Sequence, residues 1–341
     1  MQQVMRQTAS PNFATQDNKK QLTILKKEDQ LIYQQLDYNI FHIPGENPSN
    51  FLILLRGFLD AATLLGTNCF ILGSGVQRTM IDCGDMYPLN MKLMDNLLTL
   101  MKNENFIINK LFITHAIPNH FGGAWSVIEA HQKLNVQPPT VFKHLDGNDY
   151  EIEVFHNTPQ LREHVKHIND GDQFKIDEIS DSLIRVIRTP GHRKDHCSFG
   201  FTSNVHKYGL QNILFPGDMI LGTPSVSMDH LDQYINDLKR TRAMAFEKLY
   251  LVHTNGMDHA DIVVDANKKF ADYLDYRYNR LNNMIEFIES QQDLKDTVRM
   301  RLVLTCFNSH IEKLRQDGII EEEFSEVHVK NDKLGFKYSL Q

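Results

Sequence analysis

The amino-acid sequence predicts an α/β protein, a layered helix–sheet–sheet–helix sandwich followed by a small α+β domain. Two observations predict the sandwich. Short apolar strands alternate with amphipathic helices along most of the chain, and histidine or aspartate residues follow several of these strands directly. Side chains at strand ends lie on loops, where they are free to form a site. A third observation, the change to long helices near Asp265, predicts the second domain.

The first predicted domain covers residues 31–264, and its strands and helices alternate. Residues 69–72 and 79–82 are predicted strands that flank a Gly-Ser-Gly turn, and residues 90–101 form a helix with methionine and leucine at helical spacing. The Gly122-Gly123 pair opens a second helix. Three further strands each lead to a polar residue; they span residues 110–114 before His115, 182–188 before His192, and 213–215 before Asp218.

The second predicted domain covers residues 265–341. A long amphipathic helix runs to about Gln291, two shorter helices follow, and Gly318 ends the last of them. A terminal hairpin is expected from the alternation at Val327 and Val329 and a return strand that contains Tyr338. Three helices followed by a hairpin predict a winged-helix-like module. The negative charges of Glu321, Glu322, Glu323 and Glu326 disfavour contact with nucleic acid. We therefore expect this module to pack within the chain or to bind a protein partner.

Composition places the chain among ordinary globular proteins. Of its 341 residues, 41% are hydrophobic and 23% are charged, and the net charge is −7. An acidic chain does not suggest a broad basic face for nucleic acid. The most apolar run, residues 51–65, is shorter than the ~20 residues that a membrane span needs and contains Arg56 and Asp60. That run is a candidate contact surface or a structural strand or helix.

The N-terminal residues 1–30 are expected to form a polar tail. Their first part lacks the apolar core of a secretory signal. With Arg6 and no acidic residue before Asp17, this part is compatible with a mitochondrial address, although a disordered tail is the simpler interpretation. The four cysteines show no C-x-x-C pairing, which favours reduced thiols and an intracellular location. Cytoplasmic and cytoskeletal locations stay open.

The most informative segment, residues 114–123, reads Thr-His-Ala-Ile-Pro-Asn-His-Phe-Gly-Gly. In an intact loop of the form T-H-x-H-x-D-H-x-G-G, closely spaced imidazoles and a carboxylate can hold two metal ions. His115 and His120 keep their places, but Ile117 stands where the second histidine belongs and Asn119 where the acid belongs. Isoleucine cannot coordinate a metal, and a neutral amide is a poor substitute for a carboxylate.

This loop resembles that of the metallo-β-lactamase superfamily, and further segments agree in family order. Thr189–His192 with Asp195-His196 resembles T-P-G-H-T-x-x-H, and Phe215–Asp218 resembles the F-x-G-D strand end. Upstream, Gly66-Thr67-Asn68 and Ile81–Gly84 resemble the opening hairpin. The resemblance implies an αββα sandwich and a set of remnant ligands and supporting residues: His115, His120, His192 and Asp218 as ligands, with Asp82 and His196 beside them.

The last remnant ligand has two candidates, His253 and His259. The subfamily called β-lactamase-like protein 2 carries the signature Y-x-x-H-R after this histidine, and the segment from Tyr273 to Arg277 resembles it. Counting back without gaps from that signature leads to His259, which is the preferred ligand, with about four extra residues before it. His253 remains the alternative. The same subfamily has a similar small C-terminal domain, so the resemblance covers roughly residues 60–340.

The two replacements decide the expected chemistry. Each of two metal sites would keep two histidines and the shared Asp218, enough for one zinc ion with an open position. We expect zero or one zinc per chain and no two-metal centre, because neutral Asn119 supplies no charge to offset the repulsion between two ions. The predicted function is therefore a catalytically impaired member of the family, a pseudoenzyme acting as a structural or assembly subunit of a larger complex. The alternative is a weakened mononuclear hydrolase of the endoribonuclease or thioesterase kind, and no catalytic residue is assigned.

Overall fold

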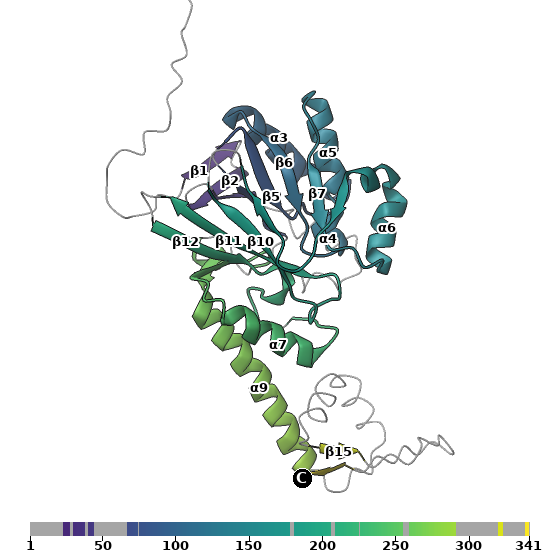
Figure 1. Ribbon diagram of the computed structural model, residues 1–341, viewed down its shortest axis with the longest axis vertical. Helices are drawn as coiled ribbons and strands as arrows, with labels where there is room; N and C mark the ends of the chain where they lie inside the picture. Colours follow the sequence, from purple (N-terminus) through teal and green to yellow (C-terminus); the bar gives the residue numbers. More distant parts are fainter. Residues whose placement is uncertain are drawn as a thin grey trace, which may run out of the picture.

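The structure is a computed structural model that describes residues 67–73, 75–177, 181–205, 209–224, 226–254 and 259–290 (Figure 1). It also describes the short strands within residues 23–43 and those at 320–322 and 338–340. Throughout this part of the chain, no helix combines the length and the apolar character needed to cross a membrane.

Two β-sheets form the centre of the molecule. The first has eight strands that are neighbours in chain order: β1 (Thr23–Lys27), β2 (Gln30–Asp37), β3 (Ile40–Ile43), β4 (Cys69–Leu72), β5 (Gln77–Ile81), β6 (Ile107–Phe112), β7 (Thr140–Lys143) and β8 (Val165–His167). The second has six strands, in the spatial order β14 (Val263–Asp265), β13 (Lys248–Tyr250), β12 (Gly209–Phe215), β11 (Cys197–Val205), β10 (Leu183–Arg188) and β9 (Gln173–Lys175).

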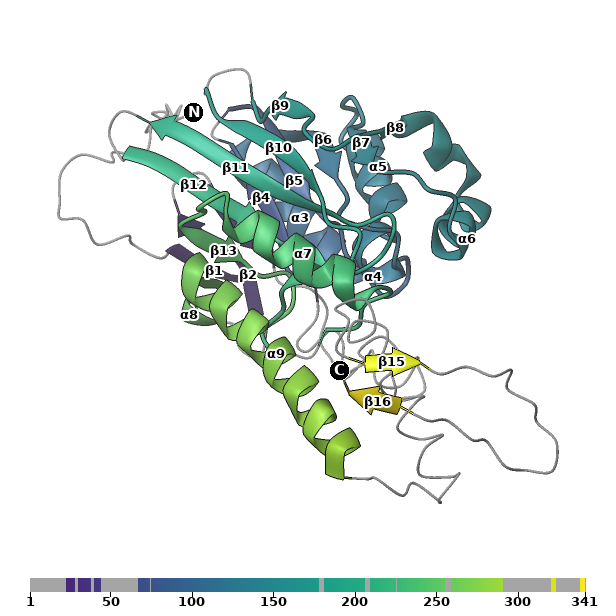
Figure 2. The same ribbon diagram turned by 60° about the horizontal axis from the view of Figure 1, so that its bottom comes forward.

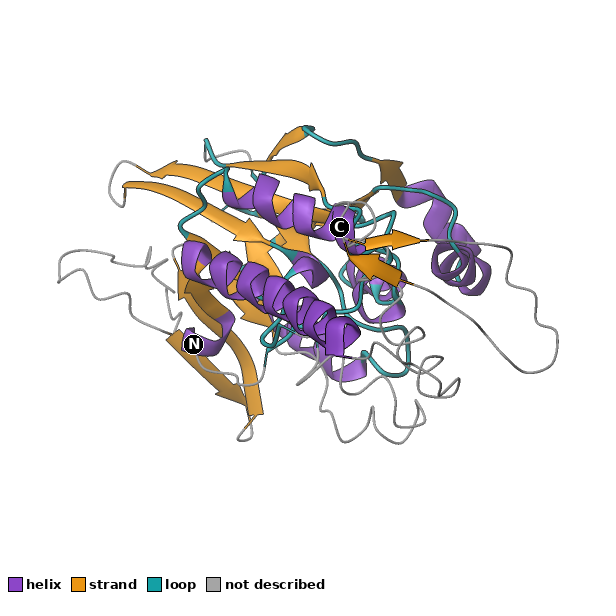
Figure 3. Ribbon diagram, turned by 90° about the horizontal axis from the view of Figure 1, so that it is seen from below, coloured by secondary structure: helices purple, strands orange, loops and turns teal. Residues whose placement is uncertain are grey.

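Helices cover the outer face of each sheet (Figures 1 and 3). On the side of the first sheet lie α3 (Met91–Glu104), α5 (Ala124–Lys133) and α6 (Asp149–Asn157). On the side of the second sheet, α7 (Leu231–Arg242) and α9 (Ala266–Ser290) pack against each other. Short helical turns lie between these elements: α4 (Pro118–Phe121), η1 (Pro159–His164), η2 (Gly217–Met219) and α8 (His259–Ile262).

Strand β4 shows why this layering buries an apolar chain on both faces. Successive side chains of a strand point to opposite faces of the sheet. Phe70 and Leu72 accordingly join the core between the two sheets, whereas Cys69 and Ile71 join the core beneath α3 and α5. All four side chains are fully buried. A strand covered on both faces reads as a continuous apolar run, which is how this segment appears in the sequence.

The α/β part of the sequence prediction is confirmed. The helix predicted at residues 90–101 extends to Glu104 as α3. It ends at Asn105, which has a left-handed backbone and whose N–H donates a hydrogen bond to the Met101 carbonyl oxygen. Met94 and Met101 are buried as expected, whereas Met91 in the first turn is 52% exposed. The buried stripe of α3 is completed by leucines: Leu93, Leu97 and Leu100.

Only some elements of the predicted C-terminal domain fall within the described residues. Helix α9 corresponds to the long helix expected after Asp265. Strand β15 (Ile320–Glu322) pairs antiparallel with β16 (Tyr338–Leu340), so Tyr338 does lie in a strand. The two shorter helices and the alternation at Val327 and Val329 lie outside the described residues, as does the apolar run 51–65. At the other end, β1 lies within the range expected to be a polar tail.

A buried histidine ties α5 to the first sheet. The ring of His131 is fully buried; its Nε2 accepts a hydrogen bond from the Ile108 amide at 3.1 Å, and its Nδ1 donates to the Val127 carbonyl at 2.8 Å. Burial lowers the pKa of His131 below the ordinary 6.5, so the ring is neutral in the folded protein at neutral pH.

This histidine should make stability depend on pH. Below about pH 6.5 the unfolded chain takes up a proton that the folded His131 resists, so its contribution to the free energy of unfolding falls as the pH falls through this window. Glutamine offers one donor and one acceptor group and does not titrate. We expect His131→Gln to cost more stability at pH 7.5 than at pH 5.5, measured by urea unfolding of both proteins; an equal cost at the two pH values would contradict this assignment.

Candidate metal centre

Two histidines of the site are placed by the end of β6 and the turn of α4. The chain leaves the sheet after Phe112, and His115 follows within three residues. Pro118 begins α4, which carries His120 toward the same point. The chain then continues through Gly123, where an added methyl group would lie 2.1 Å from the Cys83 carbonyl oxygen. Only glycine permits this close approach, which sets the path of the loop.

Asp82, which the resemblance put beside the ligands, contacts Thr114 and His120. It follows β5 with a φ of +53°, a conformation that a non-glycine residue rarely adopts. Its buried carboxylate accepts hydrogen bonds from the Thr114 amide at 2.9 Å and from His120 Nδ1 at 2.8 Å. These bonds stabilise the unusual backbone and fix the orientation of the His120 ring.

The Thr114 hydroxyl connects His115 to the same carboxylate. Its Oγ1 lies 3.0 Å from His115 Nδ1 and 3.0 Å from Asp82 Oδ2. Because the carboxylate can only accept, the hydroxyl donates to Asp82 and accepts from His115 Nδ1. Both rings therefore carry a proton on Nδ1, and Nε2 of both His115 and His120 is directed into the site.

His192 approaches from the second sheet. It follows β10, and its Nδ1 donates to the Ser227 carbonyl at 2.7 Å, so its Nε2 also faces the site. The preceding Gly191 packs under α7, where an added methyl group would lie 2.2 Å from Tyr234 Cα. No side-chain pattern marks Ser227, because it acts through its backbone, and sequence reasoning missed it for that reason.

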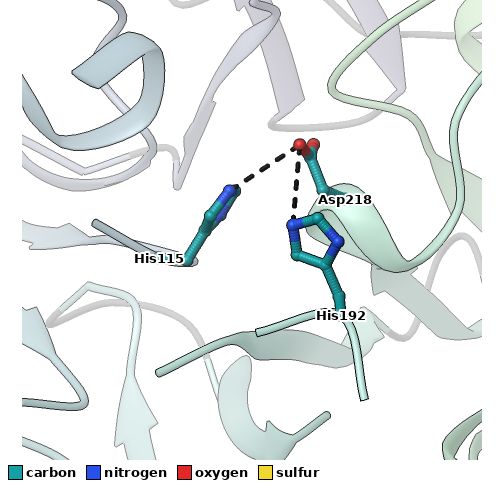
Figure 4. A group of neighbouring side chains, drawn as sticks. All are labelled: His115, His192 and Asp218. Carbon is teal, nitrogen blue, oxygen red and sulfur yellow. Dashed lines mark ion pairs between the residues drawn. The ribbon is translucent and has the colours of Figure 1, made fainter. Parts of the chain in front are cut away.

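Asp218 lies at the centre of the histidines. It sits in the short turn η2 after β12, and its oxygens are 3.4 Å from Nε2 of both His120 and His253. They are 3.7 Å from His115 Nε2 and 3.9 Å from His192 Nε2. Figure 4 shows the rings of His115 and His192 turned toward the carboxylate. Two groups of potential metal ligands result, His115–His192–Asp218 and His120–His253–Asp218.

His196 supports the aspartate rather than a ligand ring. Its Nδ1 lies 2.6 Å from the Thr189 hydroxyl, and its Nε2 accepts a hydrogen bond from the Asp218 amide at 3.1 Å. An added methyl group on Gly217 would lie 2.5 Å from the same Nε2. His196 thus fixes the backbone from which the Asp218 carboxylate projects.

The histidine that the structure brings to Asp218 from the end of β13 is His253, the alternative in the sequence argument. Asn68 holds this segment by bonds to the Leu251 and Val252 carbonyl oxygens. His259 begins α8, and its side chain lies outside the described part. A ligand role for His253 would put the extra residues after the histidine rather than before it. A count without gaps could not reveal this, because the position of the ligand depends on where β13 ends.

The two replaced positions lie at the edge of the site. Ile117 precedes α4 and is half-buried. The Asn119 amide nitrogen lies 3.2 Å from His253 Nε2 and 3.2 Å from the Thr67 hydroxyl. His253 Nε2 also lies 3.1 Å from His120 Nε2. The nitrogens of the second group thus have partners within the protein.

In the first group, His115–His192–Asp218, the Nε2 nitrogens lack such partners within the described part of the chain. Nε2 of His115 and Nε2 of His192 are buried, and neither has a hydrogen-bond partner among the described residues. Buried polar atoms are rarely left without a partner, so two such nitrogens facing one carboxylate fit a bound cation. Two imidazoles and a carboxylate are ordinary zinc ligands. The residues present therefore fit one zinc ion at His115, His192 and Asp218.

Charge is divided unevenly among the histidines around Asp218. Burial lowers the pKa of His115 well below its ordinary range and also lowers that of His192. Burial alone would lower the pKa of His120 too, but the Asp218 and Asp82 carboxylates outweigh it and raise the pKa to about 10. For Asp218, burial is outweighed by His120 and His253, which hold its pKa well below the ordinary value. His120 is therefore protonated at neutral pH, whereas His115 and His192 are neutral.

Tyr273 and Arg277, the residues of the subfamily signature, both contact the segment that follows Asp218. The Tyr273 hydroxyl accepts a hydrogen bond from the Leu221 amide at 2.7 Å and donates to the Leu221 carbonyl at 2.8 Å. Arg277 donates to the carbonyl oxygens of Pro224 and Val226. Both residues lie on α9, so this helix fixes the segment that runs from Asp218 to the Ser227 carbonyl.

Comparison with known proteins agrees with this architecture. Residues 62–253 match the metallo-beta-lactamase superfamily, and the chain belongs to that superfamily. Its relatives include the beta-lactamase-like protein 2 homologs of Caenorhabditis elegans, 22% identical with 86% of this chain and 90% of the relative covered, and of Drosophila melanogaster, 24% identical with 83% and 90% covered.

A fungal relative and a solved structure extend the comparison. The atrochrysone carboxyl ACP thioesterase nsrC of Aspergillus novofumigatus is 25% identical, but the match covers 64% of this chain and only 55% of that protein. A beta-lactamase domain protein from Burkholderia ambifaria has the same fold, with a TM-score of 0.63, 16% identity and coverage of 91% of this chain and 95% of the other.

The contacts of Tyr273 predict a measurable effect on stability. Tyr273→Phe removes a buried hydroxyl and leaves the Leu221 amide without its partner, which should lower the free energy of unfolding by about 1–3 kcal/mol. Tyr278→Phe makes the same chemical change on the same helix at a ring that is 37% exposed, and it should cost less than about 0.5 kcal/mol. Chemical denaturation of the two variants checks this, and equal effects would contradict the anchoring role of Tyr273.

Proposed function

We propose that this protein is a metallo-β-lactamase-fold pseudoenzyme, with one metal centre and impaired hydrolytic chemistry, that serves as a structural or assembly subunit of a larger complex. The observation that carries the proposal is the pair of replacements at Ile117 and Asn119 within an otherwise retained site. In this proposal residues 31–264 form the metal-binding domain and residues 265–341 a winged-helix-like module. The partner is a protein, since a net charge of −7 gives no general attraction to nucleic acid.

The metal is proposed to be a single zinc ion held by His115, His192 and Asp218. When bound there, zinc would act as a Lewis acid that polarises a carbonyl or phosphoryl oxygen. The second group would stay metal-free, because Asn119 donates toward His253 and brings no negative charge. A carboxylate at this position could accept a proton from an attacking water, which a neutral amide cannot do. Loss of that step is the physical reason for impaired hydrolysis.

The alternative function is a weak mononuclear hydrolase. The unpartnered nitrogens of His115 and His192 favour metal binding, and three protein ligands leave zinc an open position. Three of the relatives carry the name of an atrochrysone carboxyl ACP thioesterase, so a thioester is the first substrate to test. RNA is the second, because the resemblance in sequence is to an endoribonuclease-like subfamily.

The proposed ligand set predicts a difference between two histidines. His192→Ala removes a ligand and should weaken zinc binding more than ~100-fold, beyond what loss of a supporting residue costs. His253→Ala removes a histidine of the second group and should leave one zinc per chain. Metal content by mass spectrometry and competition with a zinc indicator check this on protein purified without chelators. Zinc loss in His253→Ala with retention in His192→Ala would assign the metal to the other group.

Restoring the two lost groups should separate a pseudoenzyme from a weak hydrolase. The double variant Ile117→His with Asn119→Asp regains an imidazole and a carboxylate, and it should cleave a chromogenic thioester or RNA at least ~10²-fold faster than the unaltered protein, the scale of general acid–base catalysis. The single variant Ile117→His is the matched control, because it lacks the carboxylate. Strong metal-dependent turnover by the unaltered protein would contradict the pseudoenzyme and establish the alternative.

A further inference from the structure

A buried lysine lies beside the site, and no motif points to it. Lys143 is the last residue of β7 and is fully buried. Its ammonium group makes three contacts: 2.9 Å to Asp195 Oδ2, 2.9 Å to Glu151 Oε2, and 2.7 Å to the His144 carbonyl oxygen. These three acceptors satisfy all three of its protons.

Asp195 connects Lys143 to the loop of His115 and to the loop of His192. It lies three residues after His192, and the same Oδ2 that contacts Lys143 also accepts a hydrogen bond from the Ala116 amide at 2.7 Å. Ala116 is the residue directly after His115. One carboxylate oxygen therefore joins the loop from the first sheet to the loop from the second, and Lys143 holds that oxygen in place.

The charges of the cluster support this arrangement. Burial raises the pKa of Asp195, but Lys143 and the Ala116 amide outweigh burial and hold the pKa below its ordinary value. A buried carboxylate that lost its cation would be left with an uncompensated charge and would draw in water or move. Arg193 is a weaker substitute, since its Nε lies 3.6 Å from Asp195 Oδ1 and its side chain is 20% exposed.

We propose that Lys143 is a positioning residue of the metal centre, which holds the loops of His115 and His192 at the spacing that a single ion needs by fixing Asp195 between them. The inference rests on the proposed zinc site for its effect on metal binding. Its structural part, the spacing of the two loops, does not.

Glu151 provides a matched control. It belongs to α6 and shares the Lys143 ammonium group with Asp195, and its other oxygen accepts a bond from the Gly147 amide. The described contacts of its carboxylate do not include a ligand loop. Glu151→Gln therefore disturbs the same buried ion cluster and leaves the Lys143–Asp195–Ala116 connection intact. A purely structural role of the cluster would make Lys143→Met and Glu151→Gln alike in every property except the size of the destabilisation.

Two measurements on the full-length chain test the proposal. Lys143→Met should raise the zinc dissociation constant by ~10–100-fold, the range for loss of a group that orients ligands. It should also speed hydrogen–deuterium exchange in peptides that cover residues 113–117 and 192–196. Glu151→Gln should leave both unchanged relative to the unaltered protein. If Lys143→Met does not fold, Asp195→Asn is examined in its place with the same expectations.

The outcomes separate this inference from the proposed function. Equal zinc affinity and equal exchange in Lys143→Met and the unaltered protein would overturn the positioning role, and so would equal losses in Lys143→Met and Glu151→Gln. An unaltered protein that binds no zinc would overturn the proposed metal centre, while the exchange measurement would still decide whether Lys143 holds the two loops together.

Discussion

The site depends on one buried carboxylate. Asp218 lies within 4 Å of the side-chain nitrogens of four histidines that come from both sheets, and its negative charge is the common partner that makes their burial tolerable. An ionised carboxylate in this environment must be surrounded by cations, protonated imidazoles or a metal ion. The ends of β6, β10, β12 and β13 must therefore meet at one point, and the layering of the two sheets provides it.

The supporting hydrogen bonds orient the histidine rings of the site. Asp82, the Thr114 hydroxyl and the Ser227 carbonyl each accept a hydrogen bond from the Nδ1 of one ring, those of His120, His115 and His192 in that order. Nε2 of each ring therefore faces Asp218. This support is retained although the loop has lost two ligand types. The result is uneven: within the described part of the chain, Nε2 of His115 and of His192 has no hydrogen-bond partner, whereas Nε2 of His253 lies beside Asn119 and His120.

Helix α9 also supports the site, from outside the two sheets. Through Tyr273 and Arg277 it holds the segment between Asp218 and Ser227, so the orientation of His192 depends on a helix that begins after the last strand of the second sheet. Helix α9 starts beside the strands of the second sheet and extends away from them (Figure 2).

The sequence by itself determined the α/β fold and the motif residues. His115, His120, His192 and Asp218 follow predicted strands, and the resemblance of their segments to the motifs of the family makes them candidates for ligands. Tertiary structure alone brings His253 to Asp218, because contacts between distant segments and not a local motif place this histidine. It also revealed Ser227 and Lys143, which act on the site through a carbonyl group and through Asp195. Such contacts join segments that are distant in the chain, and no local pattern of residues encodes them.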